Sequence, residues 1–393
     1  MFKRSLVVAI SAAAVLSAPW AAPAQAEGAL PLPLLPHVPF YFTDTAEASS
    51  RPEPLTAQGL KALDATYIYK GKTHTVADYL ERSSTRGFLV MKDNQILDER
   101  YFGGYSASSR FNSWSVGKSI TSAALGVAVS EGRITSIDDP VTKYVPELAK
   151  SGYNGVSIRN VLQMSSGTAY DETDYTNPTK GSTATTIRMV AGTSLIDQAK
   201  EIKRERPAGT KFNYDSMDTF VLGWVVSKAT GKSLSDYIED RIWKPTGMET
   251  SALIGKDYKG STIGYCCYHA TVRDFARFGL LYLRDGQAGG KQVLPAQWVK
   301  DSTHASAPHL QPGSLRPDKP ESSENNYGYG YQWWLGDGDR GDYSAIGILG
   351  QFIYVSPKDG IVIVKNSEDL NSEANMGEAI HAFRAIADAA AKR

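Results

Sequence analysis

The chain has 393 residues, of which 42% are hydrophobic, enough to bury a substantial core. It carries 42 basic and 42 acidic residues, so its formal net charge is zero and no basic face for nucleic acid is indicated. Its length predicts about two or three structural units, or one large enzyme domain with insertions. A small-molecule or peptide substrate suits this neutral composition better than a nucleic acid.

The first 26 residues have the pattern of a cleavable signal peptide. Lys3 and Arg4 supply a positive start, and residues 6–18 are apolar but too short to span a bilayer comfortably. Residues 24–26 (Ala-Gln-Ala) fit a cleavage site, which predicts a mature chain beginning at Glu27. We therefore expect a periplasmic or secreted protein with no membrane attachment after cleavage; a retained membrane anchor is the alternative.

Residues 27–84 are expected to form an N-terminal arm, partly extended. Its first part, residues 27–60, is rich in proline, which is incompatible with regular helix or central strand. Residues 87–102 then have the pattern of a β-hairpin with a turn at residues 92–94. This hairpin opens a main domain that we expect to cover residues 85–393.

Helices are expected to dominate the middle of the chain. A helical stretch from about residue 116 to residue 131 has its apolar residues on one face and ends at Gly132. The polar, threonine-rich stretch 171–192 is expected to be a long loop. Further helices are predicted at residues 158–164, 218–230, 234–243 and 271–283.

Strand patterns return near the C-terminus and are followed by a last helix. Strands are predicted at residues 327–334, 344–350, 352–356 and 361–366, and the helix at residues 374–391. Strands therefore lie near both ends of the main domain. This distribution predicts an α+β fold, in which one antiparallel sheet is flanked by helices and a mostly helical lobe is inserted at about residues 135–325.

The segment Ser115-Val116-Gly117-Lys118 is the sharpest chemical signal. Residues three apart at the start of a helix share one face, so Lys118 can reach the hydroxyl of Ser115. A buried lysine shifts towards its neutral form and can then take the serine's proton, which makes the hydroxyl a nucleophile. The alternative is a simple helix cap. A phosphate loop is excluded because Asn112 stands where its first glycine belongs, and no G-x-S-x-G elbow occurs.

Two later segments complement this pair. Tyr214 could shuttle a proton to a leaving group, and Ser216 could hold the substrate or the lysine; a core tyrosine and a helix cap are the alternatives. Gly347 and Gly350 lie on a predicted strand whose N–H groups could complete an oxyanion hole with the N–H of Ser115. A simple glycine bend is the alternative there.

The two cysteines, Cys266 and Cys267, are adjacent in the sequence. A framework of disulfides is therefore excluded, and a bridge between neighbours requires strained geometry, so we expect two buried thiols. No H-E-x-x-H or C-x-x-C motif occurs, and we expect neither a metal site nor a cofactor.

The order and spacing of the three segments resemble the serine β-lactamase/DD-peptidase superfamily, over about residues 85–385. Within it the chain resembles the class C-type branch, which also includes family VIII carboxylesterases. It is similar to the 6-aminohexanoate-dimer hydrolases, a group of nylon-oligomer amidases, at residues 144–148, 174–175, 332–334 and 347–351.

This resemblance implies a role for individual residues. Ser115 would be the nucleophile, Lys118 the base and Tyr214 the proton donor to the leaving group. The backbone N–H groups of Ser115 and Ile348 would form the oxyanion hole. The residues expected to contact substrate are Tyr175, Ser216, Gly347 and Trp333.

The chain also departs from the family pattern. Residues 345–347 are Ala-Ile-Gly where β-lactamases carry Lys-Thr-Gly, so the cation that grips a substrate carboxylate is missing. No acidic residue lies between Thr176 and Ala191, where the related amidases hold a substrate ammonium; Lys180 and Arg188 are present instead. We expect acyl transfer from a small ester or amide to water. A carboxylesterase acting on short acyl esters and a catalytically silent penicillin-binding-like protein are the alternatives, and the oligomeric state stays open.

Overall fold

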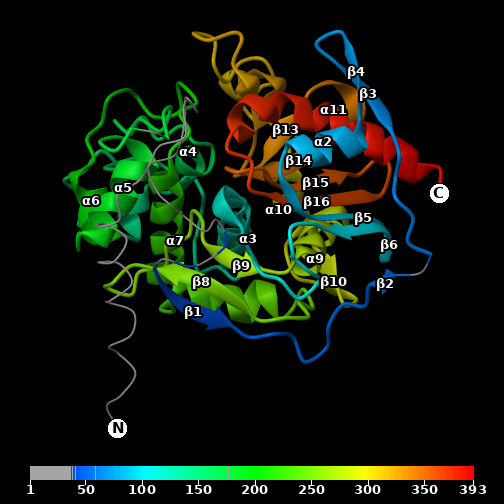
Figure 1. Ribbon diagram of the computed structural model, residues 1–393. Helices are drawn as coiled ribbons and strands as arrows, with labels where there is room; N and C mark the ends of the chain where they lie inside the picture. Colours follow the sequence, from blue (N-terminus) through cyan, green and yellow to red (C-terminus); the bar gives the residue numbers. More distant parts are fainter. Residues whose placement is uncertain (1–36, 38, 40, 58, 176) are drawn as a thin grey trace, which may run out of the picture.

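The computed structural model describes residues 37, 39, 41–57, 59–175 and 177–393 (Figure 1). The expected signal peptide, residues 1–26, lies outside the described residues, as do residues 27–36 of the expected arm. In the described part of the chain, no helix is both long and apolar enough to cross a membrane.

An eight-stranded sheet forms the centre of the fold, with strand order β12-β13-β14-β15-β16-β5-β6-β2. All neighbouring strands are antiparallel except β2 and β6, which run parallel. Three of these strands come from the N-terminal part of the chain and five from the C-terminal part, which confirms the predicted sheet built from both ends. The strands are β2 (Thr56–Ala57), β5 (Thr85–Lys92), β6 (Gln95–Tyr101), β12 (Tyr327–Tyr329), β13 (Trp334–Gly336), β14 (Tyr343–Gly347), β15 (Gln351–Ser356) and β16 (Ile361–Ser367).

Helices cover both faces of this sheet (Figure 1). Successive side chains of a strand point to opposite faces, so on β5 Leu89 and Met91 join one hydrophobic cluster while Phe88 and Val90 join another. Helix α9 (Val272–Leu283) contributes to the first cluster, and α11 (Ser372–Ala391) with α2 (Val76–Arg82) to the second. Burial on both faces explains why these strands are almost continuously apolar.

A second sheet has the strand order β1-β8-β9-β7 and brings together four distant parts of the chain. The strands are β1 (Phe42–Ala46), β7 (Phe111–Asn112), β8 (Ala252–Lys256) and β9 (Tyr268–Ala270). Strand β1 is the extended part of the arm, and it pairs antiparallel with β8 along its whole length. Strand β7 pairs with β9, which places the segment leading to Ser115 beside the segment that follows the two cysteines.

Helix α3 (Gly117–Ser130) lies between the central sheet and α7 (Ser216–Thr230), against which it packs (Figure 1). Asp215 caps α7 by accepting hydrogen bonds from the N–H groups of Met217 and Asp218. Gly231 ends the helix in the left-handed conformation at φ 72°. Other helices in the described part of the chain are α4 (Ile158–Leu162), α5 (Gly181–Val190), α6 (Leu195–Glu201), α8 (Leu234–Ile238), the π-helical η4 (Glu239–Trp243) and α10 (Ala296–Ser302).

Two short hairpins lie outside the two larger sheets. One belongs to the arm and is formed by β3 (Thr66–Tyr69) and β4 (Lys72–Thr75), which lead directly into α2. The other, formed by β10 (Gln287–Ala288) and β11 (Lys291–Gln292), follows α9.

The second sheet was not expected, since its strands β8 and β9 lie within the predicted helical lobe at about residues 135–325. Two expected elements also differ from the structure. The stretch 171–192 was expected to be a loop throughout, but α5 occupies its second half, and Thr183, Thr185 and Met189 are buried there. Tertiary burial thus overrides the weak helix propensity of a threonine-rich segment. The expected strand at residues 327–334 is interrupted, because a turn containing Gln332 at φ 65° separates β12 from β13.

Candidate active site

Ser115 lies in a short 3₁₀ helix, η1 (Trp114–Val116), between β7 and α3. Trp114 precedes it at φ 43°, a left-handed conformation that costs a non-glycine residue about 1 kcal/mol or more. The turn is held by Ser113, whose N–H donates to the Tyr268 carbonyl at 2.8 Å and whose hydroxyl accepts from the Tyr268 N–H at 3.1 Å. The strained turn therefore presents the half-buried Ser115 to the pocket described below.

Glycine is required in the middle of the Ser-Val-Gly-Lys segment. A Cβ atom at Gly117 would lie 2.5 Å from the ring of Tyr268, closer than real contacts allow. Tyr268 thus packs directly on the first residue of α3, and its hydroxyl lies 2.9 Å from that of Thr121 one turn later. The start of the helix and the β9 segment are fitted to each other at this point.

Lys118 is buried, with only 1% of its surface exposed. Its Nζ donates hydrogen bonds to Ser115 Oγ at 2.9 Å, to Ser216 Oγ at 2.9 Å and to the Tyr265 carbonyl at 3.3 Å. Burial lowers the pKa of Lys118 to about 8, although the negative charges of Glu172 and Asp215 oppose that shift. A substantial neutral fraction near pH 8 is what a lysine needs to act as a base.

Tyr214 lies beside this pair, just before α7. Lys118 Nζ lies 4.8 Å from the centroid of its ring, and Trp334 stacks on it with ring centroids 5.5 Å apart. Burial raises the pKa of Tyr214 well above its usual range, while a hydrogen bond with Ser115 opposes the shift. The phenol therefore keeps its proton and can act as a donor.

Glu172 is a site residue that sequence reasoning missed. It is buried, and it accepts hydrogen bonds of 2.7 Å from both the N–H and the hydroxyl of Ser216. Ser216 in turn accepts from Lys118, so a hydrogen-bonded chain joins the lysine to a buried carboxylate. The only signal in the sequence was the position of Glu172 three residues before Tyr175.

Strand β14 passes against the turn that carries Ser115. A Cβ atom at Gly347 would lie 2.8 Å from the Ser113 carbonyl oxygen and 3.0 Å from the Ser115 nitrogen, so only glycine fits. The next residue, Ile348, lines the same pocket as Ser115 and Gly347. The two predicted oxyanion-hole residues are therefore brought together at the end of this strand.

The pocket above Ser115 has a volume of about 170 Å³, which limits the enclosed part of a ligand to a small group. Five residues named in the sequence analysis line it: Ser115, Tyr175, Tyr214, Gly347 and Ile348. Ser216, for which contact with either the substrate or the lysine was expected, is absent from this lining and instead accepts a hydrogen bond from Lys118.

Trp333 was expected to contact substrate, and the structure places it elsewhere. Its side chain is 0% exposed and packs among Phe278, Tyr282 and Tyr343. Trp334 lines the pocket instead. Neighbouring side chains of an extended segment point to opposite sides, so an error of one residue in the sequence reading selects the wrong face.

The far wall of the pocket carries charges of both signs, contributed by the C-terminal part of the chain. The nitrogen Nε of Arg316 pairs with Glu324, and Lys319 lies nearby. Glu373, in the first turn of α11, lines the same wall. Burial and the carboxylates of Glu324 and Glu172 raise the pKa of Glu373 to about 7. None of these four residues was singled out from the sequence.

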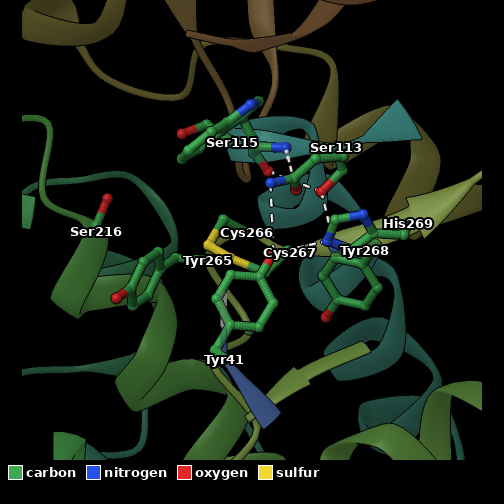
Figure 2. Close-up of a disulfide and its surroundings, with 12 residues drawn as sticks. Tyr41, Ser113, Ser115, Ser216, Tyr265, Cys266, Cys267, Tyr268 and His269 are labelled. Carbon is green, nitrogen blue, oxygen red and sulfur yellow. Dashed lines mark hydrogen bonds between the residues drawn. A yellow bond between two sulfur atoms is a disulfide. The ribbon is translucent and has the colours of Figure 1, made fainter. Parts of the chain in front are cut away.

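Cys266 and Cys267 are joined by a disulfide, so the expectation of two thiols is wrong (Figure 2). The expectation rested on the strained geometry that a bridge between neighbours requires, and the structure has such a conformation here, because the backbone of Cys267 is left-handed at φ 78°. The bridge lies between Tyr265 and Tyr268, the two residues that contact Lys118 and Ser113.

Comparisons with known proteins agree with this geometry. The β-lactamase family profile matches residues 73–391. The 6-aminohexanoate-dimer hydrolase of Paenarthrobacter ureafaciens is 31% identical over 333 residues, covering 82% of each chain. A solved structure of a provisionally assigned 6-aminohexanoate-dimer hydrolase from Bacillus anthracis superposes with a TM-score of 0.77 at 25% identity, covering 90% of this chain and 92% of that one. A penicillin-binding protein from Bacillus halodurans shares the fold, with a TM-score of 0.59 at 18% identity over 78% of this chain and 99% of that one.

The fold and the site define the class of protein, a serine hydrolase with a β-lactamase/transpeptidase-like fold. The chain belongs to the β-lactamase family, and among its relatives is the 6-aminohexanoate-dimer hydrolase of Paenarthrobacter ureafaciens.

Proposed function

We propose that this chain hydrolyses a small amide or ester through an acyl-enzyme on Ser115. The observation that carries the proposal is the 2.9 Å hydrogen bond between Lys118 Nζ and Ser115 Oγ at the wall of the pocket. A serine hydroxyl becomes an effective nucleophile when a neighbouring base can take its proton. Burial supplies such a base here, because it lowers the pKa of Lys118 to about 8.

In the acylation step, neutral Lys118 accepts the hydroxyl proton while Ser115 Oγ attacks the substrate carbonyl carbon. The N–H groups of Ser115 and Ile348 stabilise the resulting oxyanion. Tyr214 gives a proton to the leaving nitrogen or oxygen, and the proton held by Lys118 replaces it. Water then attacks the acyl-enzyme while Lys118 takes a proton from it, and Lys118 returns that proton to Ser115 Oγ as the ester bond breaks. The acid product leaves, and the Ser115 hydroxyl and neutral Lys118 are restored.

The pocket walls support a small, charged substrate. Position 345, where β-lactamases carry the lysine of Lys-Thr-Gly, is a buried alanine, so the usual grip on a substrate carboxylate is missing. Arg316, Lys319 and Glu373 instead place charges of both signs on the far wall. The relative from Paenarthrobacter ureafaciens is named for a linear amide, 6-aminohexanoate dimer, and we infer a short linear amide as the first substrate class.

An esterase acting on short acyl esters is the second candidate, favoured by the small enclosed volume of the pocket. The two candidates separate in one comparison, in which kcat/KM is measured for p-nitrophenyl esters of increasing chain length and for linear amides with the same acyl groups. A measurable amidase rate that depends on Ser115 supports the first candidate. Ester turnover with no amide turnover supports the second.

The central claim is tested by treating the protein with a fluorophosphonate probe and locating the adduct by mass spectrometry. We expect one modified residue, Ser115, and complete loss of hydrolysis in Ser115→Ala. Ser122→Ala is the matched control, because Ser122 is a buried serine of the same helix whose hydroxyl donates to the Tyr331 carbonyl. Modification elsewhere, or activity that survives Ser115→Ala, would overturn the assignment of Ser115 as the nucleophile. Absence of both labelling and hydrolysis in the wild type would favour a catalytically silent penicillin-binding-like protein.

We also infer that the protein is exported and that residues 1–26 are removed. The positive start, the apolar stretch and the Ala-Gln-Ala sequence at residues 24–26 support this, and a disulfide suits an oxidising compartment. N-terminal sequencing of the protein recovered from the periplasmic or culture fraction should begin at Glu27. Retention of residues 1–26 on membrane-bound protein would support an anchor instead.

A further inference from the structure

The residues around the disulfide hold both partners of the serine–lysine pair. On its N-terminal side, the Tyr265 carbonyl accepts a hydrogen bond of 3.3 Å from Lys118 Nζ. On its C-terminal side, the backbone of Tyr268 makes two hydrogen bonds to Ser113, two residues before Ser115. Figure 2 shows the bridge between these two tyrosines, beneath Ser113 and Ser115.

We propose that the Cys266–Cys267 disulfide is a positioning element for catalysis. It fixes the distance between the Tyr265 carbonyl, which accepts a hydrogen bond from Lys118, and the backbone of Tyr268, which holds the turn that carries Ser115. The inference rests on the proposed function, because it assigns the bridge an effect only through Ser115 and Lys118. The cysteines themselves make no contact with a reacting atom.

The backbone at this point needs such a constraint. Cys267 has a φ of 78°, a conformation that non-glycine residues adopt only where the surrounding structure holds them. Its carbonyl accepts a hydrogen bond of 2.9 Å from the N–H of Gly255 on β8, and a Cβ atom at Gly255 would lie 2.7 Å from Cys267 Cβ. The bridge closes a ring around the single peptide between the two cysteines, which restricts the rotations that would let this turn relax.

Segments on either side of the bridge are anchored directly to α3. Thr121 donates a hydrogen bond of 2.7 Å to the Gly264 carbonyl, and its hydroxyl lies 2.9 Å from that of Tyr268. Residues 264–268 therefore span one turn of α3, from Lys118 to Thr121. A shift of the peptide between the cysteines would be transmitted to the lysine through Tyr265.

The disulfide is buried and lies outside the lining of the substrate pocket. Cys266 is 7% exposed and Cys267 2% exposed. In the described part of the chain, the residues lining the pocket include neither cysteine nor Tyr265. Loss of the bridge should therefore lower kcat and the reactivity of Ser115 while leaving KM for a small ester close to its original value.

The experiment is a double-mutant cycle with Cys266→Ser, Cys267→Ser and the double variant. The second-order rate of Ser115 labelling by a fluorophosphonate is measured, together with kcat and KM for a p-nitrophenyl ester. Either single substitution removes the ring, so all three variants should lose the same factor, between about 10-fold and 100-fold in labelling rate and kcat. Additive losses, or rates equal to those of the wild type, would overturn the inference.

Reduction of the wild-type protein provides a rescue arm. A dithiol reductant transfers two electrons and two protons to the bridge, giving two cysteine thiols and its own cyclic disulfide. Once thiol titration shows two thiols per chain, the labelling rate should fall by the same factor and recover on reoxidation. An unchanged labelling rate in protein with two titrated thiols would contradict the positioning role.

Loss of stability is separated from loss of positioning by Ile386→Val. Ile386 is buried in α11, ten residues beyond Met376, the last residue of that helix to line the pocket, so this variant should lower Tm without altering kcat. All rates are measured at least about 15 °C below the Tm of each variant, where nearly all molecules are folded. If the proposed function itself is wrong, the wild type fails to label at Ser115; if only the positioning role is wrong, the wild type labels and the variants match it.

Discussion

Glu172 receives two hydrogen bonds of 2.7 Å from Ser216, one from the backbone N–H and one from the hydroxyl. The same hydroxyl accepts a hydrogen bond from Lys118 Nζ, so one serine connects the candidate base to a buried carboxylate. The negative charge of Glu172 raises the pKa of Lys118, in opposition to the larger effect of burial. The pKa of Lys118 is therefore set by its burial and by two carboxylates outside α3, Glu172 and Asp215.

This relationship predicts the pH dependence of the reaction. Lys118 must lose its proton to act as a base, so kcat/KM of the wild type should rise with pH and reach half of its maximum near pH 8. Glu172→Gln removes a charge that raises this pKa, so the midpoint should move to lower pH. Glu324→Gln is the matched control, a pocket carboxylate paired with Arg316. A midpoint that stays at the wild-type value in Glu172→Gln would contradict the assignment.

Tyr214→Phe should separate amides from activated esters. An amide nitrogen must be protonated as it leaves, whereas p-nitrophenolate leaves without a proton. We expect the amidase rate to fall by about 100-fold or more, and the p-nitrophenyl esterase rate by less than about tenfold. Tyr329→Phe, which alters a buried tyrosine packed edge-on against Tyr214, is the control. Equal losses on both substrates would show that Tyr214 acts on the nucleophile rather than on the leaving group.

Gly347→Ala tests the close approach of β14 to the nucleophile turn. The new methyl group would meet the Ser113 carbonyl at 2.8 Å and the Ser115 nitrogen at 3.0 Å. Displacement of the oxyanion-hole strand should lower kcat by about 100-fold or more. Gly223→Ala is the control, because Gly223 lies inside α7 and its new methyl group would meet the end of the Leu234 side chain on α8. A kcat for Gly347→Ala within threefold of the control value, roughly the size of an ordinary packing effect, would argue against the oxyanion role.

A second buried lysine predicts how stability depends on pH. Lys365 on β16 is 1% exposed and donates to Ser367 Oγ at 2.5 Å. Burial lowers its pKa to about 7 from 10.5. Between about pH 7 and pH 10.5, Lys365 is therefore protonated in the unfolded chain but neutral in the folded protein. Because the unfolded state binds the extra proton, the free energy of unfolding decreases as pH falls through that range.

Lys365→Met removes this dependence. The variant should gain more than about 1.4 kcal/mol over the wild type when pH falls from about 10 to about 7, the equivalent of one pKa unit. Urea unfolding at the two pH values measures the difference, and Lys358→Met, a change at an exposed lysine, is the control. If the advantage of the Met variant is the same at both pH values, Lys365 keeps its proton in the folded protein.

The parts of the site that could be predicted were those encoded locally or by order along the chain. Ser115 and Lys118 are three residues apart at a helix start, and helical geometry alone brings them together. Tyr214 and Gly347 were found because each carries a recognisable neighbour pattern in the expected order. Glu172 and Glu373 carry no such pattern, since a glutamate in a polar segment looks the same whether it is exposed or buried beside a lysine.

The sequence by itself determined the two-ended sheet, the helical middle and the Ser115–Lys118 pair, because hydrophobic periodicity and helical spacing are local properties. Only the tertiary structure decided that Trp334 rather than Trp333 faces the pocket, because the turn at Gln332 sets which side each ring takes. It likewise decided that the two cysteines are bridged, since the backbone of Cys267 is held in a left-handed conformation by contacts from distant segments. The burial of Lys118 and the charges near it come from residues far apart in the chain, so the pKa of Lys118 follows from the folded structure and not from the local sequence.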